Sequence, residues 1–301
     1  MKKTKIIFLG TPNFAIPFLK SLINESSFDI ASVITEPNRR SGRGKQLKES
    51  QVAQYVNKLN SSQIRSNKKI LLFKPIKTYD IKSKILNLKP DIAVVVAYGQ
   101  IIPDEILDIP RYGSINIHPS DLPKYRGPSP IQSALLNGDK NTKVTIMKMD
   151  AKMDHGSILD KLNIDIDEND DYSTLEKKIL TQSPKFLIKT LKKYISNKIK
   201  PKKQDHKMAT FCKLINKKDG LIDWNKSPKE IHNQIRAYAV WPKAYTTITN
   251  NKRLIFLKSK IVSGKLKPIL VQLEGRKQMS WRQFTNGYQS KLPQSLTKVL
   301  L

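Results

Sequence analysis

The chain has 301 residues, of which 55 are Lys or Arg and 25 are Asp or Glu, so its formal net charge is +30. With 39% hydrophobic residues it can bury the core of one large or two ordinary domains, which excludes a wholly disordered chain. The single cysteine excludes an intrachain disulfide framework and a cysteine-rich zinc module, and the four scattered histidines lead us to expect no metal centre.

Apolar runs in the sequence are short. None approaches the roughly 20 residues that span a bilayer, and the first, Ile6 to Leu9, is too short for the core of a signal peptide. We therefore expect a cytoplasmic protein with no membrane partner, acting as a monomer. Residues 200–301 hold 22 basic and 5 acidic side chains, as expected of a surface that faces a polyanion. A bias of the source genome towards lysine is the alternative explanation.

In the first half of the chain, short apolar runs alternate with segments of helical periodicity. Alternation of this kind is typical of parallel crossover units, and the continuous apolar run at 91–98 indicates a sheet covered on both faces. The pattern predicts an α/β domain with a doubly wound, mostly parallel, Rossmann-like sheet. The expected strands are 5–10, 29–35, 70–73, 91–98, 114–118 and 144–149, and the expected helices are 12–23, 49–59, 81–88 and 130–136.

The second half begins with a long helical pattern at 173–199. Pro184 lies inside it, so we expect two helices or one kinked helix. The polar, basic segment 200–205 is interpreted as a linker between a domain at 1–199 and a basic domain at 206–301. In the latter, a helical pattern at 228–239 precedes short alternating runs, which are typical of a small antiparallel β-barrel.

Two polar residues lie two positions apart in the strand SINIH. Asn116 and His118 should project to the same face at the carboxyl end of a parallel strand, where open α/β sheets bind ligands. The amide of Asn116 can donate to a developing oxyanion, and the imidazole of His118 can donate or exchange a proton. The alternative is a pair of ordinary, satisfied polar groups at a strand end.

The segments after this strand strengthen the catalytic interpretation. Residues 119–130 contain four prolines and a glycine, which predicts a rigid, irregular loop of the kind that builds a pocket. Asp154 follows the expected strand at 144–149 and precedes Gly156. Its carboxylate could orient His118 and stabilise the protonated ring, although an ordinary turn aspartate would look the same.

The segments that follow the first two expected strands are where phosphate-binding motifs occur in α/β proteins. Gly10 opens a helix, but the G-x-G-x-x-G fingerprint and the P-loop pattern are missing, which argues against a nicotinamide or flavin enzyme and against a nucleotide hydrolase. Residues 38–48 carry five basic side chains on a glycine-containing loop. Such a loop suits contacts with phosphates, whereas the plain alternative is a solvated run of charge.

Several motifs in order resemble those of the methionyl-tRNA formyltransferases. These are FLGTPNFAIPFL, SGRGKQL, VVVAYGQIIP, SINIHPSDLPKYRGPSPIQSALLNGD, VTIMKMDAKMDHG, LIDWNKSP, IRAYAVWPKAY and LEGRKQMSW, which together cover about residues 5–288. The resemblance implies transfer of a formyl group from 10-formyltetrahydrofolate to the α-amino group of initiator methionyl-tRNA, without a metal.

The resemblance also implies roles for individual residues. The family's catalytic trio matches Asn116, His118 and Asp154, and its tRNA-contacting loop matches the region around Arg43 and Lys45. Its tetrahydrofolate-contacting segment matches four consecutive residues, which are Ser120, Asp121, Leu122 and Pro123.

This chain departs from the family pattern at several positions. Asp121 stands where the family usually has Leu, Lys143 replaces a usual Gly, and Ser157 replaces an acid. Between residues 262 and 269 only a short connection is present where the family usually has further strands, so we expect a trimmed barrel of OB type. These departures bear on substrate geometry and tRNA affinity rather than on the reaction.

Two rival functions stay open at this point. A formyltransferase acting on the amino group of a nucleotide sugar would use the same fold and the same three catalytic residue types, but it would need neither the basic domain nor the loop at 38–48. A catalytically inert RNA-binding protein is the second rival. It would have no physical reason to keep Asn116, His118 and Asp154 together.

Overall fold

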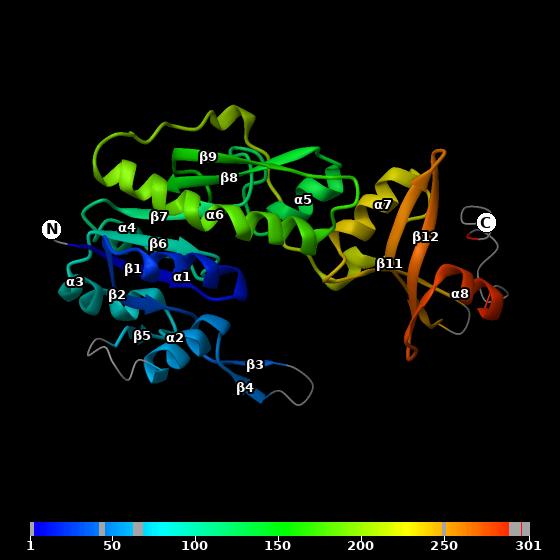
Figure 1. Cartoon of the computed structure of the whole chain (residues 1–301), viewed down its shortest axis with the longest axis horizontal. Coiled ribbons are helices and arrows are strands. Elements are labelled where there is room, and N and C mark those ends of the chain that lie inside the picture. The colour runs from blue at the N-terminus through cyan, green and yellow to red at the C-terminus, as the bar shows by residue number, and fades with distance from the viewer. Residues whose placement is uncertain (1–2, 42–45, 63–68, 249–250, 289–295, 297–301) are drawn as a thin grey trace. The chain divides into compact units, whose positions relative to one another are not determined.

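The computed structural model describes residues 3–41, 46–62, 69–248, 251–288 and Leu296. The chain divides into two compact units, each assembled from separate segments. Unit 1 comprises residues 1–126, 143–162 and 179–209, and unit 2 comprises residues 127–142, 163–178 and 210–301. Figure 1 shows the elements of both units along the chain.

Seven strands form the main sheet, in the order β5-β2-β1-β6-β7-β8-β9. Strands β5, β2, β1, β6 and β7 are parallel to one another, whereas β8 runs antiparallel to β7. The strands are β1 (Thr4–Gly10), β2 (Phe28–Ile34), β5 (Leu71–Phe73), β6 (Ile92–Val96), β7 (Ser114–His118), β8 (Asn141–Lys148) and β9 (Ser157–Asp165). The prediction of a doubly wound, mostly parallel sheet is confirmed.

The direction of winding reverses between β1 and β6. From β1 the chain moves outward through β2 to β5 and then returns to β6 on the other side of β1. The five residues of β6 are all buried, which explains why its sequence is continuously apolar rather than alternating. Because β7 lies next to β6 and runs parallel to it, His118 at the end of β7 lies at the ligand-binding edge of the sheet.

Three of the four helices in the crossover connections of the main sheet were predicted, and α4 was not. The four helices are α1 (Ile16–Asn24), α2 (Gln51–Ser62), α3 (Lys82–Leu88) and α4 (Asp104–Leu107), with 3₁₀ turns at η1 (Asn13–Ala15) and η2 (Thr78–Ile81). α6 (Tyr172–Ile195) is a single 24-residue helix despite Pro184. Along α6, the Pro184 carbonyl accepts a hydrogen bond from Ser21 Oγ, and Lys192 forms an ion pair with Glu25 at the end of α1. These contacts tie α6 to α1.

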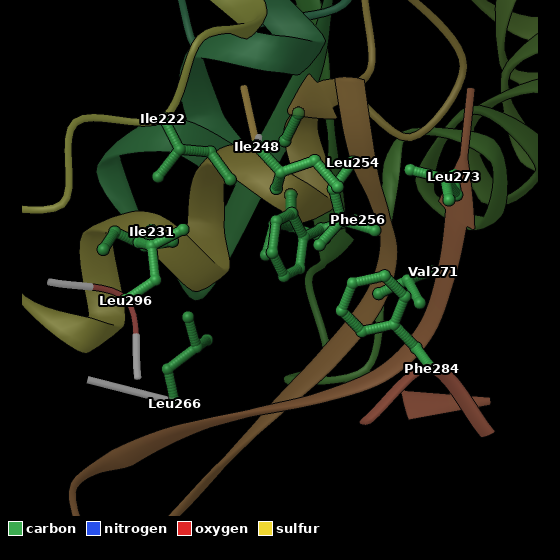
Figure 2. Packing of buried hydrophobic residues seen from close by; sticks show 12 residues of the cluster. Ile222, Ile231, Ile248, Leu254, Phe256, Leu266, Val271, Leu273, Phe284 and Leu296 are labelled. Atoms are coloured by element: carbon green, nitrogen blue, oxygen red, sulfur yellow. The ribbon is translucent and has the colours of Figure 1, made fainter. Parts of the chain in front are cut away.

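Unit 2 has its own hydrophobic core. Its elements are α5 (Pro130–Asn137), η4 (Lys217–Gly220), α7 (Pro228–Ala237), α8 (Trp281–Tyr288) and the strands β10 (Ala244–Thr247), β11 (Arg253–Val262), β12 (Lys265–Leu273) and β13 (Gln278–Ser280). The four strands form one antiparallel sheet in sequential order. Figure 2 shows Ile231 of α7, Phe256 of β11, Val271 of β12 and Phe284 of α8 in the same cluster of buried side chains.

The structure contains β-type pairing in two segments, where a loop and a linker were expected. β3 (Arg39–Ser41) and β4 (Gln46–Lys48) pair as an antiparallel ribbon within the basic loop at 38–48. The segment 200–205 leads into η3 (His206–Met208), and its Lys202 exchanges two backbone hydrogen bonds with Ile158 of β9. This part of the predicted linker is therefore attached to the main sheet.

Candidate active site

Asn116 and His118 come from the same face of β7. Asn116 lies opposite Val95 of β6 and Met147 of β8, and His118 lies opposite Thr145 of β8. The period of two along the strand gives both side chains the same direction, as the sequence predicted.

Both ring nitrogens of His118 face oxygen atoms of the protein. Nε2 lies 2.9 Å from the backbone carbonyl of Tyr125, so it carries the proton and donates. Nδ1 lies 3.6 Å from Oδ1 of Asp154. The side chains of His118 and Asp154 are only 7% and 14% exposed, so this contact is largely shielded from solvent. The structure thus brings together the His118 and Asp154 of the predicted trio.

The amide of Asn116 uses only part of its hydrogen-bonding capacity within the protein. Nδ2 donates to the carbonyl of Val95 at 3.3 Å, which leaves its second N–H for another acceptor. Oδ1 is buried and has no hydrogen-bond partner among the described residues. A buried amide oxygen is costly unless something donates to it, so this atom is a candidate contact for a ligand.

Asp154 lies in a tight turn between β8 and β9. Its φ of +51° is in the left-handed region, which a residue with a Cβ adopts only when its surroundings impose it. At Gly156 a Cβ would lie 1.9 Å from the carbonyl of Lys148, so only glycine fits this approach to the end of β8. The turn therefore holds Asp154 at the end of the sheet that carries His118.

Two side chains of the predicted folate segment, those of Ser120 and Leu122, are buried in the protein. Ser120 Oγ donates to the carbonyl of Lys124, and the side chain of Leu122 is fully buried. Thr145 Oγ1 donates to the Ser120 carbonyl at 2.6 Å and accepts from the Leu122 amide at 3.3 Å. These contacts do not test whether the segment from Ser120 to Pro123 binds folate, so that assignment stays a prediction.

Asp121, which departs from the family pattern, pairs with another departure. Its carboxylate lies 3.1 Å from Nζ of Lys143 and 2.5 Å from Nζ of Lys161. Burial alone raises the pKa of Asp121, but the hydrogen bonds and charges of Lys161 and Lys143 outweigh it, and the pKa lies below its ordinary value. Lys161 also donates to the Leu122 carbonyl, so these ion pairs clamp the loop onto β8 and β9.

Several residues at the site were missed from the sequence. Tyr125 contributes through its backbone carbonyl, which no side-chain pattern could reveal. Thr145 could have been found, because it alternates with the apolar residues of β8. Arg126 and Gln204 are buried next to the turn that carries Asp154, although they are 78 residues apart in the sequence.

The predicted tRNA contacts Arg43 and Lys45 lie outside the described residues, between β3 and β4. Among the residues that the structure describes, no group of three or more His, Cys, Asp or Glu side chains could hold a metal ion. Within the same residues, no helix is long and apolar enough to cross a bilayer.

A basic face lies on the β11–β12 hairpin of unit 2. Lys260 is directly opposite Lys267, and Lys265 is opposite Val262, so the alternation along both strands places the three lysines on one face. Like charges directly opposite each other destabilise a hairpin in isolation. This arrangement is favourable when the face contacts a polyanion.

Comparison with known proteins assigns both parts of the chain. The family model described as "Formyl transferase" matches residues 4–191, and the model of the formyl transferase C-terminal domain matches residues 214–269. Methionyl-tRNA formyltransferase of Sulfurihydrogenibium sp. is 42% identical over 265 residues, which are 87% of this chain and 82% of that protein.

Further relatives agree. Methionyl-tRNA formyltransferase of Caldicellulosiruptor saccharolyticus is 39% identical, with 95% of this chain and 97% of that protein covered. Among solved structures, a sugar 3N-formyl transferase crystallised in the presence of dTDP and 5-N-formyl-THF superimposes with a TM-score of 0.65 at 26% identity, covering 88% of this chain and 89% of that one. The chain belongs to the formyl transferase family.

Proposed function

We propose that this protein transfers a formyl group from 10-formyltetrahydrofolate to the α-amino group of methionine on initiator tRNA. The observation that carries the proposal is the placement of His118 between the Tyr125 carbonyl and the Asp154 carboxylate, beside Asn116, in a chain of this family. The proposal includes a cytoplasmic location, where methionyl-tRNA is found.

The reaction begins with attack of the neutral amine on the formyl carbon. A new C–N bond forms, and the carbonyl oxygen becomes an oxyanion that accepts hydrogen bonds from the second amide N–H of Asn116 and from Nδ1–H of His118. Nε2–H stays on the Tyr125 carbonyl and fixes the ring. Asp154 stabilises the imidazolium through its charge.

Collapse of the tetrahedral intermediate breaks the bond between the formyl carbon and the folate nitrogen. In this step the Asp154 carboxylate takes the proton lost by the attacking amine, and Nδ1 of His118 gives its proton to the departing folate nitrogen. Transfer of the proton from Asp154 to Nδ1 then restores both groups. The unpartnered Oδ1 of Asn116 suits an N–H of the incoming amine, which would orient the nitrogen towards the formyl carbon. In this mechanism the rate enhancement comes from positioning of the amine and from hydrogen bonds donated to the oxyanion.

The choice of a folate as the formyl donor is supported by a similar structure. A formyl transferase of similar structure was crystallised with 5-N-formyl-THF, a folate of the proposed kind. We assign the folate to the segment Ser120–Asp121–Leu122–Pro123, as the sequence predicted. Since the Ser120, Asp121 and Leu122 side chains have partners within the protein, this segment would present backbone and ring surfaces to the ligand.

We assign the acceptor tRNA to the basic domain at 206–301 and to Arg43 and Lys45. The face formed by Lys260, Lys265 and Lys267 supports an acceptor with a phosphate backbone. The rival acceptor, an amino sugar linked to a nucleotide, is favoured by one solved structure at 26% identity. The relatives at 39% and 42% identity cover most of the chain and act on methionyl-tRNA by name, which favours tRNA.

The test is a competition between acceptors. Purified protein is given 10-formyltetrahydrofolate with equal concentrations of methionyl initiator tRNA and a dTDP-linked amino sugar, and both products are quantified. We expect formylmethionyl-tRNA as the dominant product. Formylation of the sugar alone would assign the rival function, and tRNA binding without any formylated product would indicate an inert RNA-binding protein.

A further inference from the structure

Gln204 lies in the segment predicted to be a linker, yet its side chain is buried, with the residue only 5% exposed. Its Nε2 donates to two backbone carbonyls of the catalytic turn, that of Asp154 at 2.9 Å and that of Gly156 at 2.7 Å. One amide group therefore holds the turn on both sides of His155. It reaches the turn from a part of the chain about 50 residues away.

Arg126 fixes the orientation of the Gln204 amide. The residue is 4% exposed, and Nη2 of its guanidinium donates to Oε1 of Gln204 at 2.6 Å. Because a guanidinium only donates, Oε1 must face it, and the NH₂ group must face the two carbonyls. Arg126 also directly follows Tyr125, whose carbonyl accepts from His118. The same short segment thus contacts His118 on one side and supports the Asp154 turn on the other.

Stacked histidines join the same two segments. The rings of His155 and His206 lie parallel, with centroids 3.8 Å apart, and Nδ1 of His206 accepts from Arg126 at 2.9 Å. Desolvation, with the charges of His155 and Arg126 adding to it, lowers the pKa of His206. A neutral His206 keeps Nδ1 available as an acceptor, so the contact with Arg126 persists at neutral pH.

The conformation of the turn explains why such support is needed. Asp154 has a left-handed φ, which a residue with a Cβ keeps only where neighbouring contacts hold the backbone in place. The carboxylate extends from this strained residue towards Nδ1 of His118. Loss of the hydrogen bonds on both sides of the turn would allow the backbone to relax and the carboxylate to move away.

We propose that Gln204 is a positioning residue that acts through Asp154, with Arg126 orienting its amide. Gln204 touches neither of the other two members of the trio in any contact the structure gives, so its effect passes through the Asp154 backbone. This inference rests on the proposed catalytic role of Asp154. It gives a buried residue of the linker segment a function in formyl transfer.

The test uses Gln204→Glu in the full-length protein. The carboxylate keeps the size of the side chain and still accepts from Arg126, but it cannot donate to the two carbonyls. We expect kcat to fall by roughly 10- to 100-fold, because a displacement of about 1 Å at a catalytic group costs up to about 10²-fold. The KM for the folate donor should stay within about twofold.

A double variant separates positioning from general damage. Groups that act as one unit are not additive, so Gln204→Glu should cause no further loss of kcat when it is added to Asp154→Asn. A role in overall stability would instead lower kcat in both backgrounds by the same factor. That additive result, or an unchanged kcat in the single variant, would overturn the proposal.

Gln234→Glu is the matched control. Nε2 of Gln234 also donates to two backbone carbonyls, those of Asp219 and Leu221, at 2.8 and 3.1 Å. The control loses the same two kinds of hydrogen bond within unit 2, and we expect its kcat to stay within about twofold of the wild type. An equal fall in kcat in the control would contradict a specific role for Gln204.

Arg126→Lys provides a second route if Gln204→Glu does not fold. Lysine keeps the charge but not the fixed guanidinium geometry, so the Gln204 amide would be less well oriented. We expect a smaller fall in kcat, again without effect in the Asp154→Asn background; an additive fall would overturn the proposal. Every variant is assayed on the acceptor that the wild-type protein is found to formylate. A wrong acceptor assignment would therefore be detected with the wild type, before any variant is compared.

Discussion

In the proposed mechanism, single side chains of this site supply hydrogen bonds to an oxyanion that exists only during the reaction. Asn116→Ala and His118→Ala each remove one donor, and we expect each to lower kcat by roughly 10²- to 10³-fold. Steady-state kinetics with circular dichroism as a check on folding measure the effect. A variant that keeps more than about a third of wild-type turnover would show its residue to be a structural group at a strand end.

Asp121 and Lys143 offer a test of pairing between two unusual residues. Their side chains are 35% and 34% exposed, so the pair is screened by solvent, and we expect a coupling of about 0.5–1 kcal/mol. The measurement is denaturant unfolding of Asp121→Leu, Lys143→Met and the double variant. A coupling energy near zero would contradict the proposed clamp, and Lys161→Met in the same series would separate the two ion pairs.

Among individual residues, the sequence could predict those that share one face of a single strand. The placement of Asn116 and His118 on one face of β7 could be predicted because the period of a β-strand and the edge of a parallel sheet can both be inferred from the sequence. Their neighbours could not be predicted, because Tyr125 acts through its backbone and Gln204 arrives from a distant segment. Asp121 and Lys143 were noted as separate departures, and only the pairing of β7 with β8 brings them together.

Among the secondary-structure elements, the contact between α1 and α6 carries a prediction about acid stability. The hydrogen bond from Lys192, supported by Ser27, lowers the pKa of Glu25 from 4.5 to about 2. Because the folded pKa lies below the unfolded one, Glu25 stabilises the native state above pH 4.5, and this contribution is lost as the pH falls towards 2.

We therefore expect Glu25→Gln to flatten the dependence of Tm on pH between 4.5 and 2. Lys192→Met removes the first cause of the shift and should flatten it in a similar way. Thermal unfolding followed by circular dichroism across this range measures the slope. An unchanged slope in both variants would show that the ion pair between α1 and α6 contributes nothing to acid stability.

Element predictions succeeded where hydrophobic periodicity is strong. The parallel strands and the helices of the first half, apart from the four-residue α4, were predicted with errors of a few residues at their ends. β9 was missed because its sequence, SILDKLNID, carries charges, and β3 and β4 because both are three residues long. Pro184 left two alternatives open, two helices or one kinked helix, and the structure has a single helix that continues through Pro184 and contacts α1 there.

The division of the whole molecule into units differs from the division of its sequence. Residues 127–142 and 163–178, which belong to the first family model, share a compact unit with residues 210–301. Within that unit, Ser129 Oγ donates to the Lys213 carbonyl, and Arg236 donates to carbonyls of the 167–170 loop. Removal of the C-terminal segment would expose this surface, so charge substitutions test tRNA binding more cleanly than a deletion.

Lys260→Gln combined with Lys267→Gln is the charge substitution of choice. Each phosphate contact that is lost should reduce the slope of log affinity against log salt by about 0.9, so we expect the KM for methionyl-tRNA to rise and the slope to fall by up to about 2. Lys185→Gln with Lys189→Gln, two exposed lysines of α6, is the control with equal charge loss. Equal effects in both double variants would indicate a nonspecific effect of net charge.

The most direct test of the account follows the formyl carbon itself. 10-Formyltetrahydrofolate labelled in the formyl group is mixed with methionyl initiator tRNA and either wild-type protein or the His118→Ala variant, and the amino acid released from the tRNA is analysed. We predict labelled N-formylmethionine from the wild type and roughly 10²- to 10³-fold slower labelling with the variant. Unlabelled methionine from the wild type, or equal labelling by both proteins, would contradict formyl transfer at this site.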